Sequence, residues 1–377
     1  MKILITGGAG FIGSNLALKL LEYGHEVTVF DNLSPQIHGD NPELTSPLYG
    51  SIKNKVTFVL GNICDKQALQ QVLAEQDAVV HLAAETGTGQ SMYEIQRYVD
   101  VNVGGTALLL DILANEKTAV KKVVVASSRS IYGEGKYHSA ELGIIYPGAR
   151  NEADMLAGNF ELLCPVTQKP IELLPTDEDS KIHPSSVYGI TKQNQEQMVL
   201  TVCPSIGIAG VALRYQNVYG PGQSLSNPYT GILSIFSTRI KNNNPINIFE
   251  DGKESRDFVF IDDVVDATIL ALTKDEANNQ IFGIGSGVAT DVITVANTLV
   301  RSYGINVPVN VTGQFRLGDI RHNFADLTKA KNLLGYIPKI DFEIGIQKFV
   351  EWVNQQDIKQ DNYDLSIVEM KKRGLFK

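Results

Sequence analysis

Residues 1–13, MKILITGGAGFIG, decide the fold of this chain because they set out a strand, a turn and a helix start in direct succession. Residues 2–6 form a short β-rich run, and residues 14–21 have the pattern of a helix. Four glycines separate the two segments: Gly7, Gly8, Gly10 and Gly13. One permits a tight strand-to-helix turn, one lets the backbone approach a pyrophosphate, and Gly13 lets helix and strand pack closely.

This glycine turn predicts a dinucleotide site. A phosphate there would face unpaired N–H groups at a helix N-terminus, where the helix dipole also favours negative charge. A second strand, residues 26–30, ends in Asp31 about 20 residues further on. A carboxylate at that point accepts both ribose hydroxyls of an adenosine and repels a 2′-phosphate, so Asp31 without a neighbouring Arg or Lys favours NAD over NADP. The alternative is a glycine-rich hairpin that binds nothing.

Composition narrows the class of protein. The chain has 377 residues, enough for one large α/β domain with a smaller one, and 43% of them are hydrophobic. A net charge of −9 argues against a nucleic-acid partner, which needs a basic face, although a few arginines can still bind an anionic ligand. Neither an apolar run of about 18 residues nor a signal-peptide core is present, so we expect no membrane partner.

The cysteines predict a reducing, cytoplasmic location. Cys64, Cys164 and Cys203 are an odd number without CxxC spacing. The pair Cys164-Pro165 followed by Thr167 looks like half of a zinc knuckle, but no second cysteine lies nearby. A structural thiol is the favoured reading, and we expect no metal.

Alternating strands and helices predict a doubly wound parallel sheet of the Rossmann type. Further strands are expected at residues 56–62, 77–84, 121–128 and 208–215, with helices at 65–75, 98–115 and 188–202. Residues 32–54 are polar and show no helical period. In such sheets ligands lie beyond the carboxyl ends of the strands.

Two parts of the chain depart from this alternation. Residues 133–175 are loop-like and too long for an ordinary βα connection, so we interpret them as an insertion that covers the active site. From residue 217 the elements become shorter, which predicts a dinucleotide-binding domain at 1–216 and a smaller C-terminal α/β substrate-binding lobe at 217–377. Within that lobe, residues 258–285 are expected to pack back on the main sheet.

Tyr188 and Lys192, in YGITK, are one helical turn apart on one face. Tyrosine has an ordinary pKa near 10, so it acts as a base at neutral pH only when its phenolate is stabilised. A lysine cation one turn away and a positively charged nicotinamide ring supply that field. Ser128, at the end of a predicted strand, can bond the same substrate hydroxyl. The alternative is an ordinary surface Tyr-Lys pair.

Six ordered motifs carry a family resemblance over nearly the whole chain: TGGAGFIG, HLAA, SSRSIYG, YGITK, LRYQNVYGPG and GKESRDFVFIDDV. The chain resembles the extended short-chain dehydrogenase/reductases that act on nucleotide sugars. The resemblance implies Ser128, Tyr188 and Lys192 as the catalytic set. It also implies cofactor contacts from Gly7, Gly10, Phe11, Ile12, Asp31, Asn32, Asn62, Ile63, Leu82, Ala83, Asn102, Tyr188 and Lys192. Asn62 departs from the aspartate usual in the family, which weakens that contact.

The same resemblance implies a nucleotide-diphosphate sugar as substrate. Arg256 and Arg316 match arginines that clamp the diphosphate, and Asn217 matches an asparagine that approaches the substrate; alone they read as ordinary polar residues. Further substrate contacts are expected from Gln90, Ser91 and Arg129. For Arg321, His322 and Asp326, a structural role is an equal alternative.

The residues before the YG of SSRSIYG indicate the reaction. Family dehydratases have an Asp-Glu pair there and decarboxylases keep a glutamate, whereas this chain has Arg129 and Ser130. Epimerisation or simple oxidoreduction remains, and a retained NAD with a lone tyrosine acid/base suits epimerisation.

Finer motifs, TGTGQSMYEI and the run from TDED to HPSSVYGITK, are similar to the dTDP-L-rhamnose 4-epimerases, which make dTDP-6-deoxy-L-talose. Other UDP- or dTDP-hexose or hexuronate 4-epimerases remain open. A 4-ketosugar reductase and a non-catalytic dinucleotide sensor are hypotheses from other classes. The resemblance also suggests a homodimer that pairs the helices at 98–115 and 188–202.

Overall fold

The computed structural model describes residues 1–225, 227, 231–358, 360–361 and 363–377. Its centre is a parallel sheet with the strand order β13-β9-β5-β4-β1-β2-β3. The strands are β1 (Lys2–Thr6), β2 (Glu26–Asp31), β3 (Thr57–Leu60), β4 (Ala78–His81), β5 (Lys122–Ser128), β9 (Ala209–Tyr215) and β13 (Gln280–Ile284). β4 and β5 are buried throughout, as central strands with helices on both faces must be. The expected doubly wound α/β fold is therefore present.

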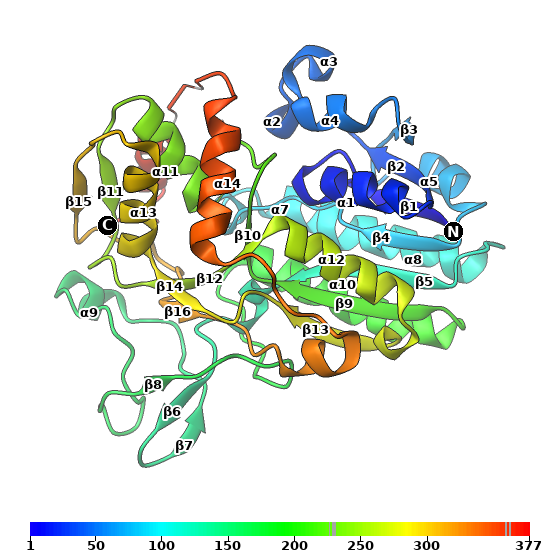
Figure 1. Cartoon of the computed structure of the whole chain (residues 1–377). Helices are drawn as coiled ribbons and strands as arrows, with labels where there is room; N and C mark the ends of the chain where they lie inside the picture. Colours follow the sequence, from blue (N-terminus) through cyan, green and yellow to red (C-terminus); the bar gives the residue numbers. More distant parts are fainter. Residues whose placement is uncertain (226, 228–230, 359, 362) are drawn as a thin grey trace.

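Alternate side chains of each strand enter two separate cores. Ile3 and Ile5 belong to the core that α1 (Phe11–Glu22) and α12 (Ile261–Thr273) cover, whereas Leu4 belongs to the opposite one. The second core is covered by α5 (Lys66–Leu73), α8 (Gly105–Asn115) and α10 (Val187–Ser205). Helices thus cover both faces of the sheet (Figure 1). Asp65 caps α5 as expected, accepting from the N–H groups of Gln67 and Ala68.

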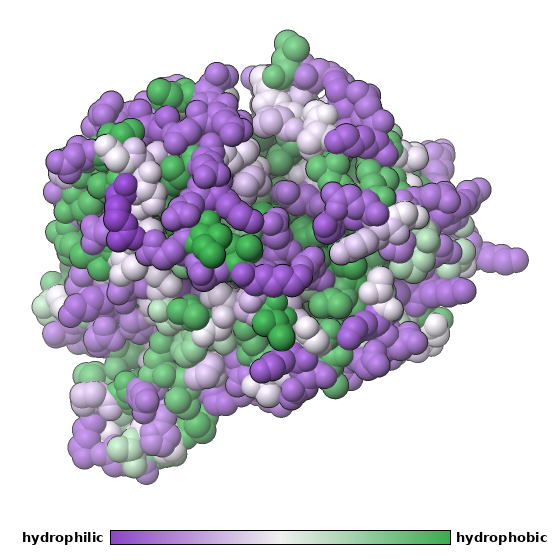
Figure 2. Space-filling view, viewed as in Figure 1, coloured by the Kyte–Doolittle hydropathy of each residue, from purple (hydrophilic) through white to green (hydrophobic). Residues whose placement is uncertain are grey.

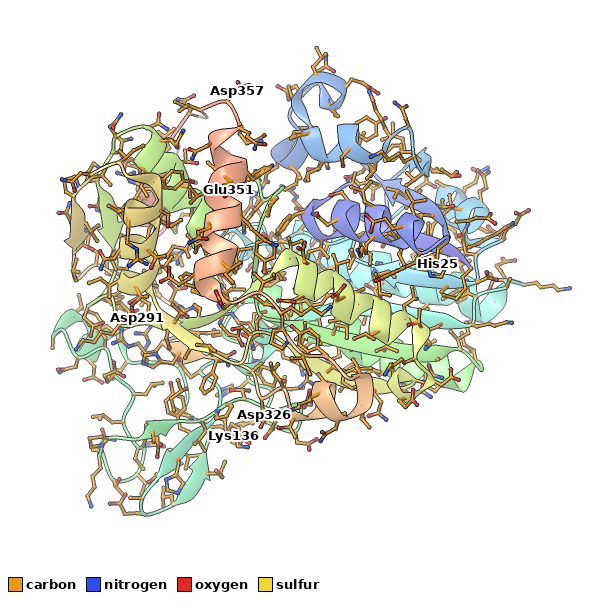
Figure 3. All side chains as sticks on the ribbon, viewed as in Figure 1. His25, Lys136, Asp291, Asp326, Glu351 and Asp357 are labelled. Atoms are coloured by element: carbon orange, nitrogen blue, oxygen red, sulfur yellow. The ribbon has the colours of Figure 1, made fainter. Side chains whose placement is uncertain are left out.

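The C-terminal elements build smaller sheets beside the large one. They are β10 (Asn217–Tyr219), α11 (Ile232–Lys241), β11 (Ile246–Ile248), β12 (Ser255–Phe260), β14 (Ala289–Asp291), α13 (Val292–Tyr303), β15 (Val309–Val311), β16 (His322–Asn323), α14 (Phe342–Asn354) and α15 (Tyr363–Lys372). β12 pairs with β10, β14 and β16, and β11 pairs with β15. Asp291 caps α13 through a 2.7 Å bond from Thr294 N (Figure 3). Between β12 and β14 the chain returns to the large sheet through α12 and β13, and β13 pairs there with β9.

Two expectations about local structure were incomplete. Residues 32–54 contain the short helices α2 (Pro35–His38), α3 (Pro42–Thr45) and α4 (Pro47–Ile52). Each starts at a proline, which suits a first helical position, but each is too short to show a period. The predicted helix 98–115 is α7 (Ile95–Tyr98), a π-helical stretch η1 (Val99–Gly104) and then α8.

The insertion, which the sequence describes only as loop-like, contains regular elements of its own. It contains the antiparallel sheet β7-β6-β8, from β6 (Tyr137–Ser139), β7 (Gly143–Ile145) and β8 (Glu172–Leu173), and the short helix α9 (Glu152–Leu156). Strands of two or three residues are too short to show an alternating pattern in the sequence. The small sheet projects from the body of the molecule (Figure 1).

The visible surface carries charged and polar residues with small apolar areas between them (Figure 2). Among the helices of the described residues, none has the length and apolar character needed to cross a membrane.

Candidate active site

A first cavity of about 350 Å³ lies at the carboxyl ends of β1, β2, β4 and β5. Gly7, just after β1, has φ +68°, and a Cβ there would lie 2.7 Å from Ala83 N. At Gly13, in the first turn of α1, a Cβ would lie 2.5 Å from Gly8 Cα. A side chain at either position would push strand, turn and helix apart. The glycines therefore allow the first N–H groups of α1 to face the cavity, where an anion can bind.

Asp31 ends β2 and faces the same cavity. Its Oδ2 accepts from Ala9 N at 3.0 Å and its Oδ1 from Leu33 N at 2.8 Å, so backbone groups fix the carboxylate. His38 Nε2 lies 3.9 Å from Oδ1, and burial lowers the pKa of His38, which favours the neutral imidazole. A fixed carboxylate suits ribose hydroxyls and the glycine turn suits a pyrophosphate, so the residues present fit NAD.

Most residues expected to contact the cofactor line this cavity. They are Gly7, Gly10, Phe11, Ile12, Asp31, Asn32, Ile63, Leu82, Ala83, Tyr188 and Lys192. Asn62 and Asn102 are not among the described residues that line it. Asn62 points to solvent and accepts from Cys64 N at 3.0 Å.

Asn102 is fully buried and serves the protein itself. Its amide bonds both backbone groups of Glu85, at 2.7 and 3.1 Å, and Thr191 Oγ1 at 2.9 Å. These bonds use its polar atoms to join η1 to residue 85 and to α10. In this structure Asn102 supports the cavity wall, and its nicotinamide-side contact stays a prediction.

Sequence reasoning missed the cavity residues contributed by α2 and α4, including Gln36, Ile37, His38 and Leu48. Their segment carried no periodic signal, and only the folded chain brings it over the glycine turn. His38 is held there by a 2.7 Å bond between its Nδ1 and Ser46 Oγ.

The three expected catalytic residues meet in this cavity. Ser186 caps α10, so Tyr188 lies in the first turn and Lys192 one turn later. Lys192 Nζ lies 5.9 Å from the centre of the Tyr188 ring and donates to Ala126 O at 3.0 Å. Ser128 ends β5 opposite them. The local spacing of α10 and the strand end thus supply the set from two elements.

Ser128 is oriented by its neighbour Ser130. The N–H and the hydroxyl of Ser130 both donate to Ser128 Oγ, at 3.1 and 2.9 Å. Because Ser128 Oγ already accepts two bonds, its own proton is left to donate. It bonds Tyr188, and this bond lowers the pKa of Tyr188 against the stronger rise caused by burial.

Burial raises the pKa of Tyr188, and neighbouring groups oppose that rise. Burial lowers the pKa of Lys192 to about 7. The positive charge of Arg129 also lowers the pKa of Tyr188, acting with Ser128 against burial. A tyrosine in a cleft whose pKa is shifted by such neighbours is a candidate general base.

A second cavity of about 370 Å³ adjoins the first, and Ser128 and Tyr188 line both. Residues 86–89, α11, β11 and α15 form its walls. A ligand in it can therefore present an atom to Tyr188 while the cofactor lies on the other side of that residue.

Three arginines, Arg129, Arg256 and Arg316, line the second cavity together with the carboxylates Glu250, Glu254 and Asp319. Arg129 Nη1 is buried without a hydrogen-bond partner among the described residues, and burial, then the charge of Arg256, lowers the pKa of Arg129 to about 9. Arg256 Nη1 donates to two backbone oxygens, at 2.8 and 2.9 Å, and this residue makes no ion pair within the described part of the chain. Arg316 pairs with Asp319 at 2.8 Å and stacks over Phe249 at 5.2 Å.

Of the other residues expected to contact the substrate, one lines the second cavity and two do not. Asn217 lines the second cavity, and its Oδ1 is buried without a partner among the described residues. Gln90 and Ser91 do not line it, because the short helix α6 (Thr88–Ser91) turns them inward. Gln90 Nε2 bonds Glu94 at 3.1 Å, and Ser91 Oγ accepts from Tyr188 N at 3.0 Å. In this structure these two residues hold the cavity wall in place, and their contact with a substrate stays a prediction.

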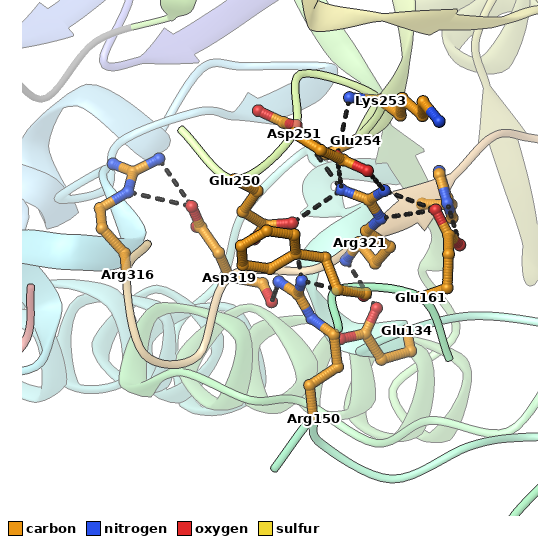
Figure 4. A network of polar contacts seen from close by, with 12 residues as sticks. Glu134, Arg150, Glu161, Glu250, Asp251, Lys253, Glu254, Arg316, Asp319 and Arg321 are labelled. Atoms are coloured by element: carbon orange, nitrogen blue, oxygen red, sulfur yellow. Dashed lines mark hydrogen bonds and ion pairs between the residues drawn. The ribbon is translucent and has the colours of Figure 1, made fainter. Parts of the chain in front are cut away.

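Arg321 is a structural residue behind this cavity. Its Nη1 lies 2.8 Å from Glu250, 2.7 Å from Asp251 and 3.7 Å from Glu254, and its Nη2 lies 2.5 Å from Glu161 of the insertion (Figure 4). The three lobe carboxylates would otherwise be close enough to hold a metal ion. The guanidinium takes that place and ties the insertion to the lobe.

Comparison with known proteins identifies the family. The model described as "NAD dependent epimerase/dehydratase family" matches residues 3–151 and 164–285. The chain belongs to this family. The resemblance seen in the motifs is thereby confirmed, and the chain is an NAD-dependent enzyme of the epimerase/dehydratase family.

Among relatives of this family member, dTDP-L-rhamnose 4-epimerase of Burkholderia thailandensis is 38% identical over 94% of this chain and 95% of its own. The putative UDP-glucose 4-epimerase of Methanocaldococcus jannaschii is 31% identical over 94% and 99%. In structure, the UDP-glucose 4-epimerase of Thermotoga maritima with UDP-glucose matches with a TM-score of 0.75, at 30% identity over 94% and 99%. MoeE5 in complex with UDP-glucuronic acid and NAD matches at 0.73 and 26% identity, with the same coverage.

Proposed function

We propose that this enzyme is an NAD-dependent nucleotide-sugar 4-epimerase that interconverts dTDP-L-rhamnose and dTDP-6-deoxy-L-talose. One observation carries the proposal: Tyr188 and Ser128 lie where the first cavity, beside the glycine turn, meets the second cavity, which arginines line. The choice of sugar is supported by the relative from Burkholderia thailandensis, which shares 38% identity over nearly the whole chain.

In the proposed reaction Tyr188, as phenolate, takes the proton of the C4 hydroxyl. The positive charges of Lys192 and Arg129 favour the phenolate. Ser128 donates a hydrogen bond to the oxygen atoms of Tyr188 and of the C4 hydroxyl. The glycine turn, Asp31 and Lys192 would hold NAD, which would supply the acceptor and donor of the C4 hydride. The resulting 4-keto sugar turns about its diphosphate and presents its other face. Tyr188 then gives the proton back, so C4 is inverted without net redox change.

Arg129 and Ser130 argue for this reaction over elimination or decarboxylation. They stand directly after Ser128, where an acid would be needed, and Ser130 is committed to orienting Ser128. Arg256 and Arg316 suit the diphosphate, because planar guanidinium groups can bond its oxygens in pairs. Firm binding of the diphosphate leaves the sugar free to turn.

A hexuronate 4-epimerase is the second candidate. The unpaired, buried Nη1 of Arg129 favours it, because a cation in the sugar end of the cavity would bond a carboxylate well. Another UDP- or dTDP-hexose 4-epimerase and a 4-ketosugar reductase remain further alternatives.

Proton NMR of C4 inversion tests the proposal. The purified enzyme is incubated separately with dTDP-L-rhamnose, UDP-glucose and UDP-glucuronate, without added cofactor. We expect inversion of dTDP-L-rhamnose. Inversion of UDP-glucuronate alone would select the second candidate, and stoichiometric consumption of added NADH or NADPH would indicate a reductase. Inversion of none would defeat the proposal.

Replacing Arg256 tests the diphosphate contact. We expect Arg256→Leu to raise KM for the sugar nucleotide about 10- to 100-fold, the loss of one charge-assisted interaction of about 1.5–3 kcal/mol. The content of bound NAD should not change, because Arg256 lines only the second cavity. Arg301→Leu is the control, since Arg301 pairs with Glu343 on the exposed surface. An unchanged KM would exclude Arg256 from the site.

We also propose a homodimer that pairs the helices at 98–115 and 188–202. Exposed apolar residues on or beside these helices support it: Met92, Ile95, Val99 and Ile190. A clean monomer in equilibrium sedimentation would reject it. The three free thiols fit the proposed cytoplasmic location.

A further inference from the structure

Helix α15, near the C-terminus, lays one face along the second cavity. The cavity is lined by Tyr363, Ser366, Ile367 and Met370, which follow the spacing i, i+3, i+4 and i+7 of one helical stripe. Tyr363, Ser366 and Met370 are buried, whereas Leu365 and Val368 on the other side are 66% and 50% exposed. The helix thus has its buried side on the cavity.

The N-terminal end of α15 is attached to the lobe. Tyr363 stacks on Phe249 with 6.4 Å between ring centres, and the Arg239 guanidinium lies 4.6 Å above the Tyr363 ring. Arg239 also pairs with Asp364 at 3.3 Å. This end of the helix therefore lies at β11, away from Tyr188.

The other end of α15 reaches the large domain. A Cβ built on Gly89 would lie 3.9 Å from Met370 Sδ, so Met370 faces the 86–89 wall. Arg373 follows and stacks over Tyr93 at 4.0 Å. This wall is next to Tyr188, whose N–H bonds Ser91. Seven residues of helix span about 10 Å, so α15 crosses the cavity from β11 to the catalytic end.

The chain after α15 supports two further cavity residues. Phe315 and Lys377 exchange backbone hydrogen bonds of 3.1 and 3.0 Å beside the antiparallel bridge between Arg316 and Phe376. Phe376 contacts the Phe249 ring at 4.9 Å. Residues 363–377 consequently hold the arginine that lines the cavity as well as forming a wall of it.

We propose that the stripe Tyr363, Ser366, Ile367 and Met370 is a substrate-binding wall, with Tyr363 at the nucleotide end and Met370 in contact with the sugar. The inference rests on the proposed function, because that function puts the reacting carbon at Tyr188 and the sugar therefore beside residues 86–89. Met370 offers a soft apolar surface without a donor, which suits the methyl edge of a 6-deoxy sugar and not a carboxylate.

The test compares two ligands that differ only by the sugar. Calorimetry gives the Kd of dTDP and kinetics gives KM for dTDP-L-rhamnose, for wild type and variants. Met370→Ala should raise KM about tenfold, the effect of one or two methylenes lost from an apolar pocket, and leave the Kd of dTDP within about twofold. Tyr363→Leu should weaken both ligands about tenfold.

Two further variants separate contact from folding. Met370→Leu keeps the volume and should restore KM, and Val368→Ala, on the exposed side of the same helix, should leave both constants unchanged. If Met370→Ala leaves KM unchanged, or raises the Kd of dTDP as much as KM, the inference is overturned alone. If wild type binds neither dTDP nor dTDP-L-rhamnose, the proposed function fails with it.

Discussion

Tyr188→Phe is expected to lower kcat by about 10²- to 10⁴-fold, the usual contribution of a positioned general base. The variant loses only the hydroxyl, because the ring of Tyr188 packs edge-on against Tyr98 with 6.5 Å between ring centres and phenylalanine keeps that contact. Bound NAD and the melting temperature should therefore stay close to wild type. Single-turnover NMR of C4 inversion measures the effect.

Tyr23→Phe is the control for this change, since Tyr23 is 56% exposed and lies outside both cavities. It should turn over as wild type does. Full turnover of Tyr188→Phe would remove Tyr188 from the reaction and with it the proposed assignment of acid and base.

Glu196→Leu is expected to lower the free energy of unfolding by about 3–5 kcal/mol, the cost of leaving one partner of a buried ion pair alone. Arg214 bonds Glu196 twice, at 2.6 and 3.0 Å, and both residues are almost fully buried. Glu196 also accepts from Ser127 at 2.6 Å, directly before Ser128. The lost carboxylate would leave the Arg214 charge between β9 and α10. Urea unfolding measures the change.

The matched control breaks an exposed pair. Arg301 and Glu343 lie 2.9 Å apart with more than half of each side chain exposed, so Glu343→Leu should cost less than about 1 kcal/mol. Equal losses in the two variants would mean that burial does not set the strength of the Arg214–Glu196 pair.

The expected site residues that the structure brings together depend on short spacings in the sequence. Gly7 and Gly13 belong to one turn, Asp31 ends the next strand, and Tyr188 and Lys192 are one turn apart in α10. Such relations are decided within a few residues by backbone geometry. The structure accordingly brings all of them to one cavity.

For the expected site residues Gln90, Ser91 and Asn102, the direction of the side chain decides which groups they contact. Gln90 and Ser91 lie in the right segment, but α6 turns them toward the protein and leaves residues 86–89 at the cavity. Asn102 lies in a π-helical stretch, which shifts the phase of a helix and sends its amide to Glu85 and Thr191. Neither direction can be read from the order of residues.

The sequence by itself determined the parallel sheet, the glycine turn after β1 and the placing of Tyr188 and Lys192 on one face of α10, because periodicity and local backbone geometry specify each of them. Only the tertiary structure decided that His38 stands beside Asp31, that Arg321 fills the carboxylate cluster and that α15 closes the second cavity. These contacts join segments far apart in the chain, and they depend on how separate elements pack. No pattern within one segment contains that information.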